Sequence, residues 1–460
     1  MRLGVVILAA GLGTRMKSTL PKVMHVLAGK TLLTRVIETA SMLNPHKIFL
    51  VLGFGAELIK QYYDHPNFSK IREKLVFVHQ AEQLGTGHAV LQTLPHYSKR
   101  LDKILVLYGD VPCIKKQTLD HLWQVASSSP LSLLTIHTEK PQGLGRILRA
   151  KDNPQEIIAI VEEKDASSEQ KKIQEIWTGA LIADRTLLEA FLPKLNNQNN
   201  QKELYLTDIV AHAKEAGLRI DTVEPKYDFE ISGVNDPLQL ATLERKFQVH
   251  QAENLAKEGL YISDTQRFDL RGDLKFKSDC KIDVGVILEG AVILGRNVSI
   301  GPYCYLKDVE IQDNTNIQAH TIIEGAKIGS SCNLGPFARI RPGTELFAES
   351  KVGNFVEIKK SVLKNKVKVN HLSYIGDAEI GENTNIGAGT ITCNYDGKNK
   401  HPTKIGAYNS IGANSALIAP IETGDHVALG AGTILTKNIN SNKLVYNKIS
   451  RQEFEKTNKK

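Results

Sequence analysis

The chain contains few cysteines, and their arrangement excludes the common cysteine-based sites. Five cysteines occur in 460 residues, with no CxxC pair and no cysteine–histidine cluster at the spacing of zinc ligands. An odd number of widely spaced cysteines is typical of free thiols in a reducing compartment, so we expect a cytoplasmic protein. The five positions are Cys113, Cys280, Cys304, Cys332 and Cys393.

The sequence also lacks a membrane span and a nucleic-acid-binding pattern. The apolar run Leu3–Ala10 continues into Gly11–Arg15 without a signal-peptide cleavage region, and no stretch approaches the ~20 apolar residues of a membrane helix. The net charge of +8 is modest for this length, and no basic run carries interleaved aromatic residues. We therefore expect no membrane insertion and no nucleic-acid partner, with the excess positive charge on a solvated surface or at sites for anionic small molecules. The lysine-rich tail 456–460 is expected to be disordered.

The first half of the chain alternates between strand and helix patterns. Apolar residues make up 42% of the chain, enough to build the cores of two or three domains. This alternation predicts a mostly parallel sheet with helices on both faces, in which ligands bind at the carboxyl ends of the strands. The expected strands are Val5–Ala9, Ile48–Leu52, Leu75–His79 and Ile104–Leu107, and a helix is expected over Leu32–Leu43.

A period of six residues dominates the second half. Before it, Leu240, Leu243 and Phe247 lie at helical spacing and predict one connecting helix to about Ala256. A six-residue period requires one short strand and one turn per repeat, with the aliphatic residue pointing inward, and this predicts a parallel β-helix. The segment Cys393–Lys404 interrupts the period and is expected to form a protruding loop. The aliphatic positions are Ile282, Leu288, Leu294, Ile300, Leu306, Ile328, Leu334, Ile340, Leu346, Val352, Ile358, Ile380, Ile386, Ile405, Ile411, Leu417, Leu429 and Leu435.

Three polar motifs follow predicted strands of the first half. The segment Ala10–Met16 has two glycines that would let backbone N–H groups approach phosphates, and Arg15 and Lys22 supply positive charge. It is a poor dinucleotide-binding loop, because Met16 stands where a third glycine is needed. The segment Gln80–Gly87 could bind the edge of a base. Asp110, after the fourth strand, is placed to hold Mg²⁺, although such an aspartate alone is more often a cap or turn residue.

Together these motifs resemble those of sugar-phosphate nucleotidyltransferases. With a β-helix following, the whole chain resembles the bacterial family of bifunctional N-acetylglucosamine-1-phosphate uridylyltransferases / glucosamine-1-phosphate N-acetyltransferases. The resemblance implies a Rossmann-like α/β nucleotidyltransferase domain over residues 1–237, a linker helix over 238–258, and a left-handed parallel β-helix over 259–460. It also implies a homotrimer.

The resemblance implies a uridylyltransferase site in the first domain. Nucleotide contacts come from the backbone of residues 8–11, phosphate contacts from Arg15 and Lys22, and Mg²⁺ ligands from Asp110 and Asn235. The implied residues are Leu8, Ala9, Ala10, Gly11, Arg15 and Lys22; Gln80, Gly85 and Thr86 at uracil; Tyr108, Gly109, Asp110 and Asn235; and Gly145 and Glu162 at the sugar. Trp177 departs from the family pattern, which has an asparagine that contacts the sugar. Trp177 either alters the sugar contacts or packs beside the pocket.

A second site is expected in the β-helix. Acetyl transfer to an amine requires a base, and histidine can serve because its ring is largely neutral near neutral pH. Alone, His371 would more often be a surface residue, but the resemblance implies that it is the catalytic base. It also implies sugar-phosphate contacts from Arg341, Lys359, Tyr374 and Asn385, and acetyl-CoA contacts from Ala388, Asn394, Tyr395, Ala413, Ala431 and Lys448. Ala413 and Lys448 replace the serine and arginine that are usual in the family.

The leading hypothesis is therefore a bifunctional enzyme that acetylates glucosamine 1-phosphate and then uridylylates the product. The reaction would use acetyl-CoA, UTP and Mg²⁺, and would convert N-acetylglucosamine 1-phosphate to UDP-N-acetylglucosamine, a precursor of bacterial cell-wall and outer-surface polysaccharides. One alternative is a single-activity nucleotidyltransferase whose β-helix serves only oligomerisation. Another is a sugar-nucleotide-binding scaffold without turnover.

Overall fold

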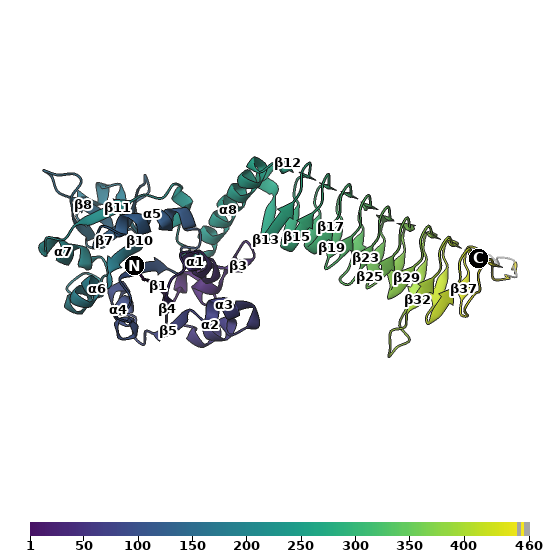
Figure 1. Cartoon of the computed structure of the whole chain (residues 1–460), viewed down its shortest axis with the longest axis horizontal. Helices are drawn as coiled ribbons and strands as arrows, with labels where there is room; N and C mark the ends of the chain where they lie inside the picture. The colour runs from purple at the N-terminus through teal and green to yellow at the C-terminus, as the bar shows by residue number, and fades with distance from the viewer. Residues whose placement is uncertain (449–451, 455–460) are drawn as a thin grey trace, which may run out of the picture. The chain divides into compact units, whose positions relative to one another are not determined.

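The computed structural model describes residues 1–448 and 452–454 and divides into two compact units. The first unit comprises Met1–Phe247 and the second Gln248–Lys460. The boundary falls inside helix α8 (Pro237–Lys257), which is the connecting helix expected from the sequence (Figure 1). The lysine-rich tail predicted to be disordered lies outside the described residues.

A nine-stranded mixed sheet forms the centre of the first unit. Its main path runs in the order β11-β7-β10-β6-β1-β4-β5, in which β6, β1, β4 and β5 are parallel neighbours and β10 is antiparallel to both β6 and β7. The predicted strands and helix of this unit are confirmed, with ends that differ by at most a few residues. The strands are β1 (Leu3–Ala9), β4 (Lys47–Leu52), β5 (Leu75–His79), β6 (Lys103–Tyr108), β7 (Leu131–His137), β8 (Arg146–Arg149), β9 (Ile157–Val161), β10 (Glu175–Asp184) and β11 (Ile220–Val223), with a separate hairpin of β2 (Val26–Leu27) and β3 (Lys30–Thr31).

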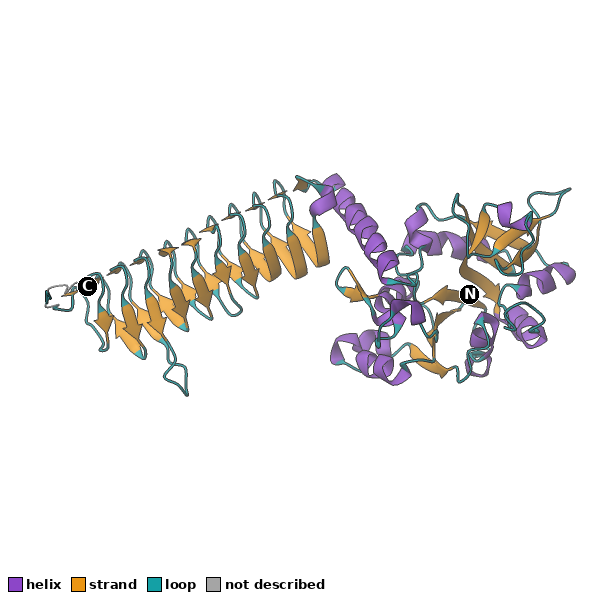
Figure 2. Cartoon of the chain, turned by 180° about the vertical axis from the view of Figure 1, so that it is seen from behind, coloured by secondary structure: helices purple, strands orange, loops and turns teal. Residues whose placement is uncertain are grey.

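Both faces of this sheet are buried. Alternate residues of β1 enter two different apolar cores: Val6 and Leu8 enter one, and Val5 and Ile7 enter the other. Helices supply the opposite wall of each core, as the predicted two-sided sheet requires (Figure 2). The helices are α1 (Leu32–Ser41), α2 (Ala56–Tyr63), α3 (Ser69–Arg72), α4 (Thr86–Leu91), α5 (Lys116–Ala126), α6 (Arg185–Phe191) and α7 (Asp208–Glu215).

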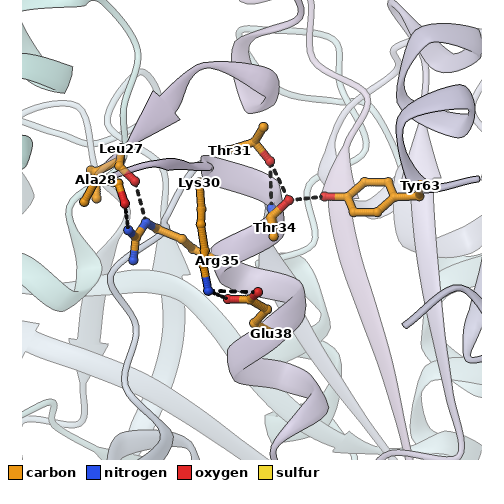
Figure 3. A network of polar contacts seen from close by, with 8 residues as sticks. All are labelled: Leu27, Ala28, Lys30, Thr31, Thr34, Arg35, Glu38 and Tyr63. Atoms are coloured by element: carbon orange, nitrogen blue, oxygen red, sulfur yellow. Dashed lines mark hydrogen bonds and ion pairs between the residues drawn. The ribbon is translucent and has the colours of Figure 1, made fainter. Parts of the chain in front are cut away.

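Helix α1 shows how local sequence sets an element in place. Thr31 caps its start by accepting a hydrogen bond from the backbone N–H of Thr34 at 3.1 Å, and the Thr34 hydroxyl lies 2.9 Å from the Tyr63 hydroxyl of α2 (Figure 3). From the same helix, Arg35 donates to the carbonyls of Leu27 and Ala28, each at 2.7 Å (Figure 3). These contacts fix the β2–β3 hairpin against α1.

The same hairpin is also fixed to helix α8. Glu244 accepts a hydrogen bond from the backbone N–H of Ala28 at 2.7 Å, and the Arg35 guanidinium lies 4.4 Å from the centre of the Phe247 ring. Leu243 and Leu27 are buried in one small core. The hairpin follows the segment that contains Lys22, and α8 follows Asn235. The network therefore ties together two segments that both reach the candidate site.

The second unit is a parallel β-helix, as the six-residue period predicts. In one sheet Ile282 pairs with Ile300, and Ile300 with Ile317, so successive coils are 18 and 17 residues long. Every aliphatic position of the period identified in the sequence is buried in a single continuous core. The predicted interruption is also confirmed, since the chain leaves the coils between β31 and β32 (Figure 1).

Two sheets make up this β-helix. The first contains β12 (Tyr261–Ile262), β14 (Lys281–Ile282), β16 (Ser299–Ile300), β18 (Asn316–Ile317), β21 (Asn333–Leu334), β24 (Lys351–Asn354), β27 (Lys368–His371), β30 (Asn385–Ile386), β33 (Ser410–Ile411), β36 (Ala428–Leu429) and β38 (Leu444–Val445). The second bends round a corner and contains β13 (Asp269–Phe276), β15 (Ile287–Leu294), β17 (Tyr305–Ile311), β19 (Ile322–Glu324), β20 (Lys327–Ile328), β22 (Arg339–Ile340), β23 (Glu345–Leu346), β25 (Glu357–Lys359), β26 (Val362–Leu363), β28 (Tyr374–Gly376), β29 (Ala378–Ile380), β31 (Ile391–Cys393), β32 (Thr403–Ile405), β34 (Ala416–Ile418), β35 (Ile421–Thr423) and β37 (Ile434–Leu435).

Small hydrogen-bond donors line the inside of the coil corners. Cys304 and Cys332 donate through sulfur to the carbonyls of Gln318 and Phe347, each at 3.1 Å, and Thr315 donates to a carbonyl in the same way at 2.8 Å. A backbone carbonyl at a buried corner needs such a partner, because the strands on either side cannot supply one. The cysteines are thus structural members of the β-helix.

The burial of the cysteines predicts a single reactive thiol. Loss of hydration raises the pKa of Cys113 to about 12 and those of Cys304 and Cys332 to about 11, so at pH 8 almost none of these thiols is ionised. Cys280 is also buried, whereas Cys393 is partly exposed. We expect one thiol per chain to react rapidly with Ellman's reagent in the folded protein, and the rest only after denaturation. The Cys393→Ser variant should lose the rapid phase, and a second rapid thiol would contradict this reading.

Candidate functional sites

A pocket of about 280 Å³ opens at the carboxyl ends of β1, β5 and β6. This is the sheet edge at which the sequence places its three polar motifs. Ten residues predicted to bind the nucleotide line it: Leu8, Ala9, Ala10, Gly11, Lys22, Gln80, Gly85, Thr86, Tyr108 and Asp110. The structure therefore brings together segments that lie far apart in the chain, in an arrangement suited to a nucleotide.

One cation and two oxygen ligands converge at the mouth of this pocket. The Lys22 ammonium forms an ion pair with Asp110 and also donates to the Asn235 side-chain oxygen at 3.0 Å. Because one ammonium contacts both oxygens, the side chains of Asp110 and Asn235 face the same point of the site. Among the described residues no group of three or more His, Cys, Asp or Glu side chains is arranged for a metal. An oxygen pair fits Mg²⁺, which commonly takes one or two protein ligands and completes its shell with water and phosphate.

The loop predicted to bind the base is rigidly held. Gln80 is buried, and its amide nitrogen lies 3.1 Å from Nδ1 of His88. Gly85 has φ of 109°, and a side chain there would collide with the Leu204 carbonyl at 2.6 Å, so glycine is required. Thr86 accepts a hydrogen bond from the backbone of Leu206 at 3.1 Å. The segment around residues 203–206 thus braces this loop, and Glu203 from that segment also lines the pocket.

The predicted sugar residues Gly145 and Glu162 lie side by side, and neither lines this pocket. Gly145 precedes β8 and Glu162 follows the paired strand β9, and a side-chain carbon at Gly145 would lie 3.6 Å from the Glu162 carboxylate. Burial raises the pKa of Glu162 above its usual range. Burial also raises the pKa of Tyr108, with further contributions from the negative charges of Glu162 and Asp110. Tyr108, which lines the pocket, is therefore near both of these carboxylates.

Arg15 and Gly109 differ from the other predicted nucleotide residues. Arg15 is exposed in a single 3-10 turn after Gly13 and does not line the pocket. Gly109 is buried, and a side chain there would meet the Leu8 carbonyl at 3.1 Å, so its contribution is close packing beside Asp110. Their predicted nucleotide contacts remain predictions.

Trp177 faces the protein core. Its side chain is 5% exposed and belongs to the apolar cluster beneath β10. The indole N–H donates to the carbonyl of Ala180 at 3.3 Å, and the ring lies edge-on to Tyr108 with centroids 6.2 Å apart. Its backbone N–H donates to the carbonyl of Gly145 at 2.9 Å, as any residue except proline could. Of the two interpretations drawn from the sequence, this geometry favours packing beside the pocket.

In the β-helix, His371 is exposed at the end of β27 and is oriented by the preceding coil. Its Nδ1 lies 2.9 Å from the side-chain oxygen of Asn354, the residue paired with it in β24. An amide oxygen only accepts hydrogen bonds, so this contact favours the tautomer of a neutral ring in which Nδ1 carries the hydrogen and Nε2 keeps its lone pair.

A second polar cluster occupies the adjoining face. Arg341 forms an ion pair with Glu357 at 2.8 Å, and Tyr374 is paired in register with Glu357. The Lys359 ammonium lowers the pKa of Lys400, so two like charges lie close together. Two neighbouring ammonium groups form a positive surface that suits a phosphate. Asn385 lies on the face of His371, beside Lys368 in the register.

The predicted acetyl-CoA residues fall into two groups. Ala388, Ala413 and Ala431 occupy equivalent positions in three successive coils, where the backbone N–H groups of Asn414 and Gly432 donate to the carbonyls of Ala388 and Ala413 at 2.7 Å. They form a column of small residues along one corner. Asn394 is 7% exposed and donates to Asp377, so its side chain fastens the protruding loop. Tyr395 and Lys448 are exposed.

Several residues at these sites were not assigned from the sequence. Gln83 and Glu203 line the nucleotide pocket, Asn354 orients His371, and Lys400 joins Lys359. Asn354 could have been found, because it precedes His371 by one coil of 17 residues. Glu203 and Lys400 lie in irregular segments whose paths follow from no periodicity.

Within the described residues, no helix is long and apolar enough to cross a membrane.

Comparison with known proteins places these sites in context. A family model of the MobA-like NTP transferase domain matches residues 5–203, and one of the GMPPB C-terminal domain matches residues 270–349. The bifunctional protein GlmU of Acinetobacter baylyi is 48% identical over 455 residues, covering 99% of this chain and 97% of its own. GlmU of Marinobacter nauticus is 48% identical over 443 residues, covering 96% and 95%. A crystal structure of UDP-glucose pyrophosphorylase with UDP-glucose covers 54% of this chain at 20% identity, with a TM-score of 0.45, too distant to inform the sites.

Because Trp177 is buried in the core, we expect its substitution to lower the free energy of unfolding of the first unit. Truncation to alanine would leave a large cavity in the core of the first unit, and we expect Trp177→Ala to cost about 3–5 kcal/mol in the free energy of unfolding of that unit. Trp177→Phe should cost about 1 kcal/mol, because only the Ala180 hydrogen bond and part of the ring are lost. Denaturant titration followed by circular dichroism measures both changes. Trp123→Ala is the matched control, since Trp123 is only partly buried, and an equal or larger loss there would contradict the core role of Trp177.

Proposed function

Because the chain belongs to the family of the bifunctional protein GlmU, we propose that it catalyses two successive steps of UDP-N-acetylglucosamine synthesis. The first step acetylates glucosamine 1-phosphate with acetyl-CoA, and the second transfers UMP from UTP to N-acetylglucosamine 1-phosphate. The observation that carries this function is the extent of the match, which at 48% identity spans both units of one chain. In a single-activity nucleotidyltransferase the β-helix would serve only oligomerisation and would not need a histidine oriented as His371 is by Asn354.

We assign acetyl transfer to the β-helix with His371 as the base. Nε2, left free by the contact of Nδ1 with Asn354, takes a proton from the substrate amine as the nitrogen attacks the acetyl carbonyl carbon. The new C–N bond forms as the C–S bond breaks. The proton that His371 has taken from the amine matches the negative charge of the CoA thiolate that leaves. Lys359, Lys400 and Arg341 supply positive charge for the sugar phosphate. The column of Ala388, Ala413 and Ala431 offers a flat edge for acetyl-CoA.

We assign uridylyl transfer to the pocket of the first unit. A phosphate oxygen of the sugar phosphate attacks the α-phosphorus of UTP in line, and pyrophosphate leaves. The chain mainly positions the reactants: the loop around Gln80 and Gly85 holds the base, Gly145 and Glu162 face the sugar, and Lys22 supplies positive charge. Mg²⁺ held by Asp110 and Asn235 would neutralise charge on the phosphates.

Two variants should separate the activities. His371→Ala removes the base and should lower the rate of acetyl transfer by about 10²–10⁴-fold while pyrophosphate release from UTP is unchanged. Asp110→Asn should do the reverse, with a loss of about 10²-fold or more in pyrophosphate release. CoA thiol and pyrophosphate are measured separately. His426→Ala and Asp120→Asn are matched controls on the same two units. If either active-site variant lowered both activities in a folded protein, the two-site assignment would be wrong.

We further propose a homotrimer in the cytoplasm. Along one corner of the β-helix, the rings of Tyr303, His320, Phe337 and Phe355 stack in sequence, with neighbouring centroids 5.4, 4.8 and 5.5 Å apart. Phe337 is 48% exposed and Phe355 57%, an apolar edge suited to burial against another copy of the chain. His371 and Lys359 lie on different faces of one β-helix, so a neighbouring copy could complete each site.

The proposed location in the cytoplasm is supported by the five unpaired thiols, which fit a reducing compartment.

The aromatic edge predicts which substitution dissociates the trimer. Phe337→Glu would bury a charge in the interface, and we expect sedimentation velocity to show monomers at concentrations where the wild type is three times heavier. Tyr408→Glu is the control, because Tyr408 is 49% exposed and stacks on His426 at another corner. Acetyl transfer should fall together with trimer content. A trimeric Phe337→Glu protein, or a dissociated Tyr408→Glu protein, would place the interface elsewhere.

A further inference from the structure

The Lys22 ammonium occupies the position between the two candidate metal ligands. It forms an ion pair with Asp110 and donates to Asn235 at 3.0 Å. The Lys22 and Asp110 side chains are only 15% and 18% exposed, so solvent screens this pair weakly. Lys22 therefore neutralises the carboxylate that a divalent cation would use.

The base of the Lys22 side chain is fixed, whereas its end can move. Gly13, with φ of 61°, packs so closely that a side chain there would lie 2.7 Å from Cβ of Lys22. The preceding Pro21 is packed against Gly55 in the same way, at 2.2 Å from where a side-chain carbon would be. Beyond Cβ, the flexible stem leads into the pocket, which Lys22 and Asp110 both line. The ammonium can thus leave Asp110 for a pocket ligand without any backbone change.

We propose that Lys22 is a built-in competitor of the divalent cation, which gains access to Asp110 and Asn235 only when nucleotide phosphates draw the ammonium away. The inference rests on the proposed uridylyltransferase function and adds an order of binding to it. An ammonium and a divalent cation cannot share the same two oxygens, so one must leave before the other binds. A phosphate chain in the pocket offers Lys22 an alternative partner of higher charge. Metal and nucleotide then bind cooperatively, each increasing the affinity for the other.

Direct metal binding tests this competition. Mn²⁺ is titrated into the full-length protein without nucleotide, and free Mn²⁺ is followed by electron paramagnetic resonance. Removing the ammonium while keeping the apolar stem, in Lys22→Met, should tighten Mn²⁺ binding by about tenfold or more relative to wild type. Adding Asp110→Asn to Lys22→Met should abolish that gain. Adding α,β-methylene-UTP should tighten Mn²⁺ binding to the wild type much more than to Lys22→Met.

Lys30→Met is the matched control. Lys30 is eight residues further along the chain and pairs with Glu38 of α1 at 2.9 Å (Figure 3). It does not line the pocket. This variant should bind Mn²⁺ like the wild type. Equal or weaker Mn²⁺ binding by Lys22→Met would overturn the inference, and so would a gain that survives Asp110→Asn. Lys22→Gln gives the same test if Lys22→Met does not fold.

A parallel assay separates this inference from the proposed function. Pyrophosphate release is measured with wild-type protein, UTP, Mg²⁺ and N-acetylglucosamine 1-phosphate. If pyrophosphate is released but wild type and Lys22→Met bind Mn²⁺ with equal affinity, the proposed competition is wrong and the proposed function stands. The expected result is both pyrophosphate release and the Mn²⁺ difference. Without pyrophosphate release the proposed function would fail, whereas the Mn²⁺ affinities of the wild type and of Lys22→Met would still decide whether Lys22 competes with the cation.

Discussion

The register between parallel strands is the constraint on which both units depend. Parallel neighbours end at the same edge of a sheet, so the loops that follow them begin side by side. In the first unit, Ala9 is paired with Leu52, and Leu8 with Tyr108. The glycine-rich loop after β1 and the aspartate after β6 therefore meet, although about a hundred residues separate them in sequence. Without that register Lys22, Asp110 and Asn235 would not share one position.

The same constraint acts in the β-helix through the length of its coils. Residues that are one coil apart in the sequence become neighbours in space. The spacing of polar residues along the chain therefore decides which of them can form a site together. Asn354 reaches His371 in this way, and the alanine column arises from equivalent positions in three coils. At several corners a buried threonine or cysteine side chain donates to a backbone carbonyl, as Thr315 and Cys332 do. The coils hold the exposed polar groups in fixed positions before a ligand binds, so little conformational entropy is lost on binding.

Much of this arrangement could be predicted from the sequence, because it follows from periodicity. The aliphatic residues at a step of six are all buried, and the central strands of the first unit lie where alternating patterns place them. Orientation is less predictable, because tertiary packing decides it. Trp177 could face the sugar or the core, and only the positions of Tyr108 and Ala180 resolve the choice. Likewise, Lys400 lies in an irregular loop whose return path depends on contacts such as Asn394 with Asp377.

The central claim is that one chain performs both reactions in sequence, and a two-stage assay of the wild-type protein tests it most directly. Glucosamine 1-phosphate and acetyl-CoA are supplied first, with CoA thiol as the readout, and UTP with Mg²⁺ is then added, with pyrophosphate as the readout. We predict thiol release in the first stage and pyrophosphate release in the second, at the expense of the acetylated sugar. Pyrophosphate release from added N-acetylglucosamine 1-phosphate, with no thiol release from glucosamine 1-phosphate, would contradict the claim and leave a single-activity nucleotidyltransferase.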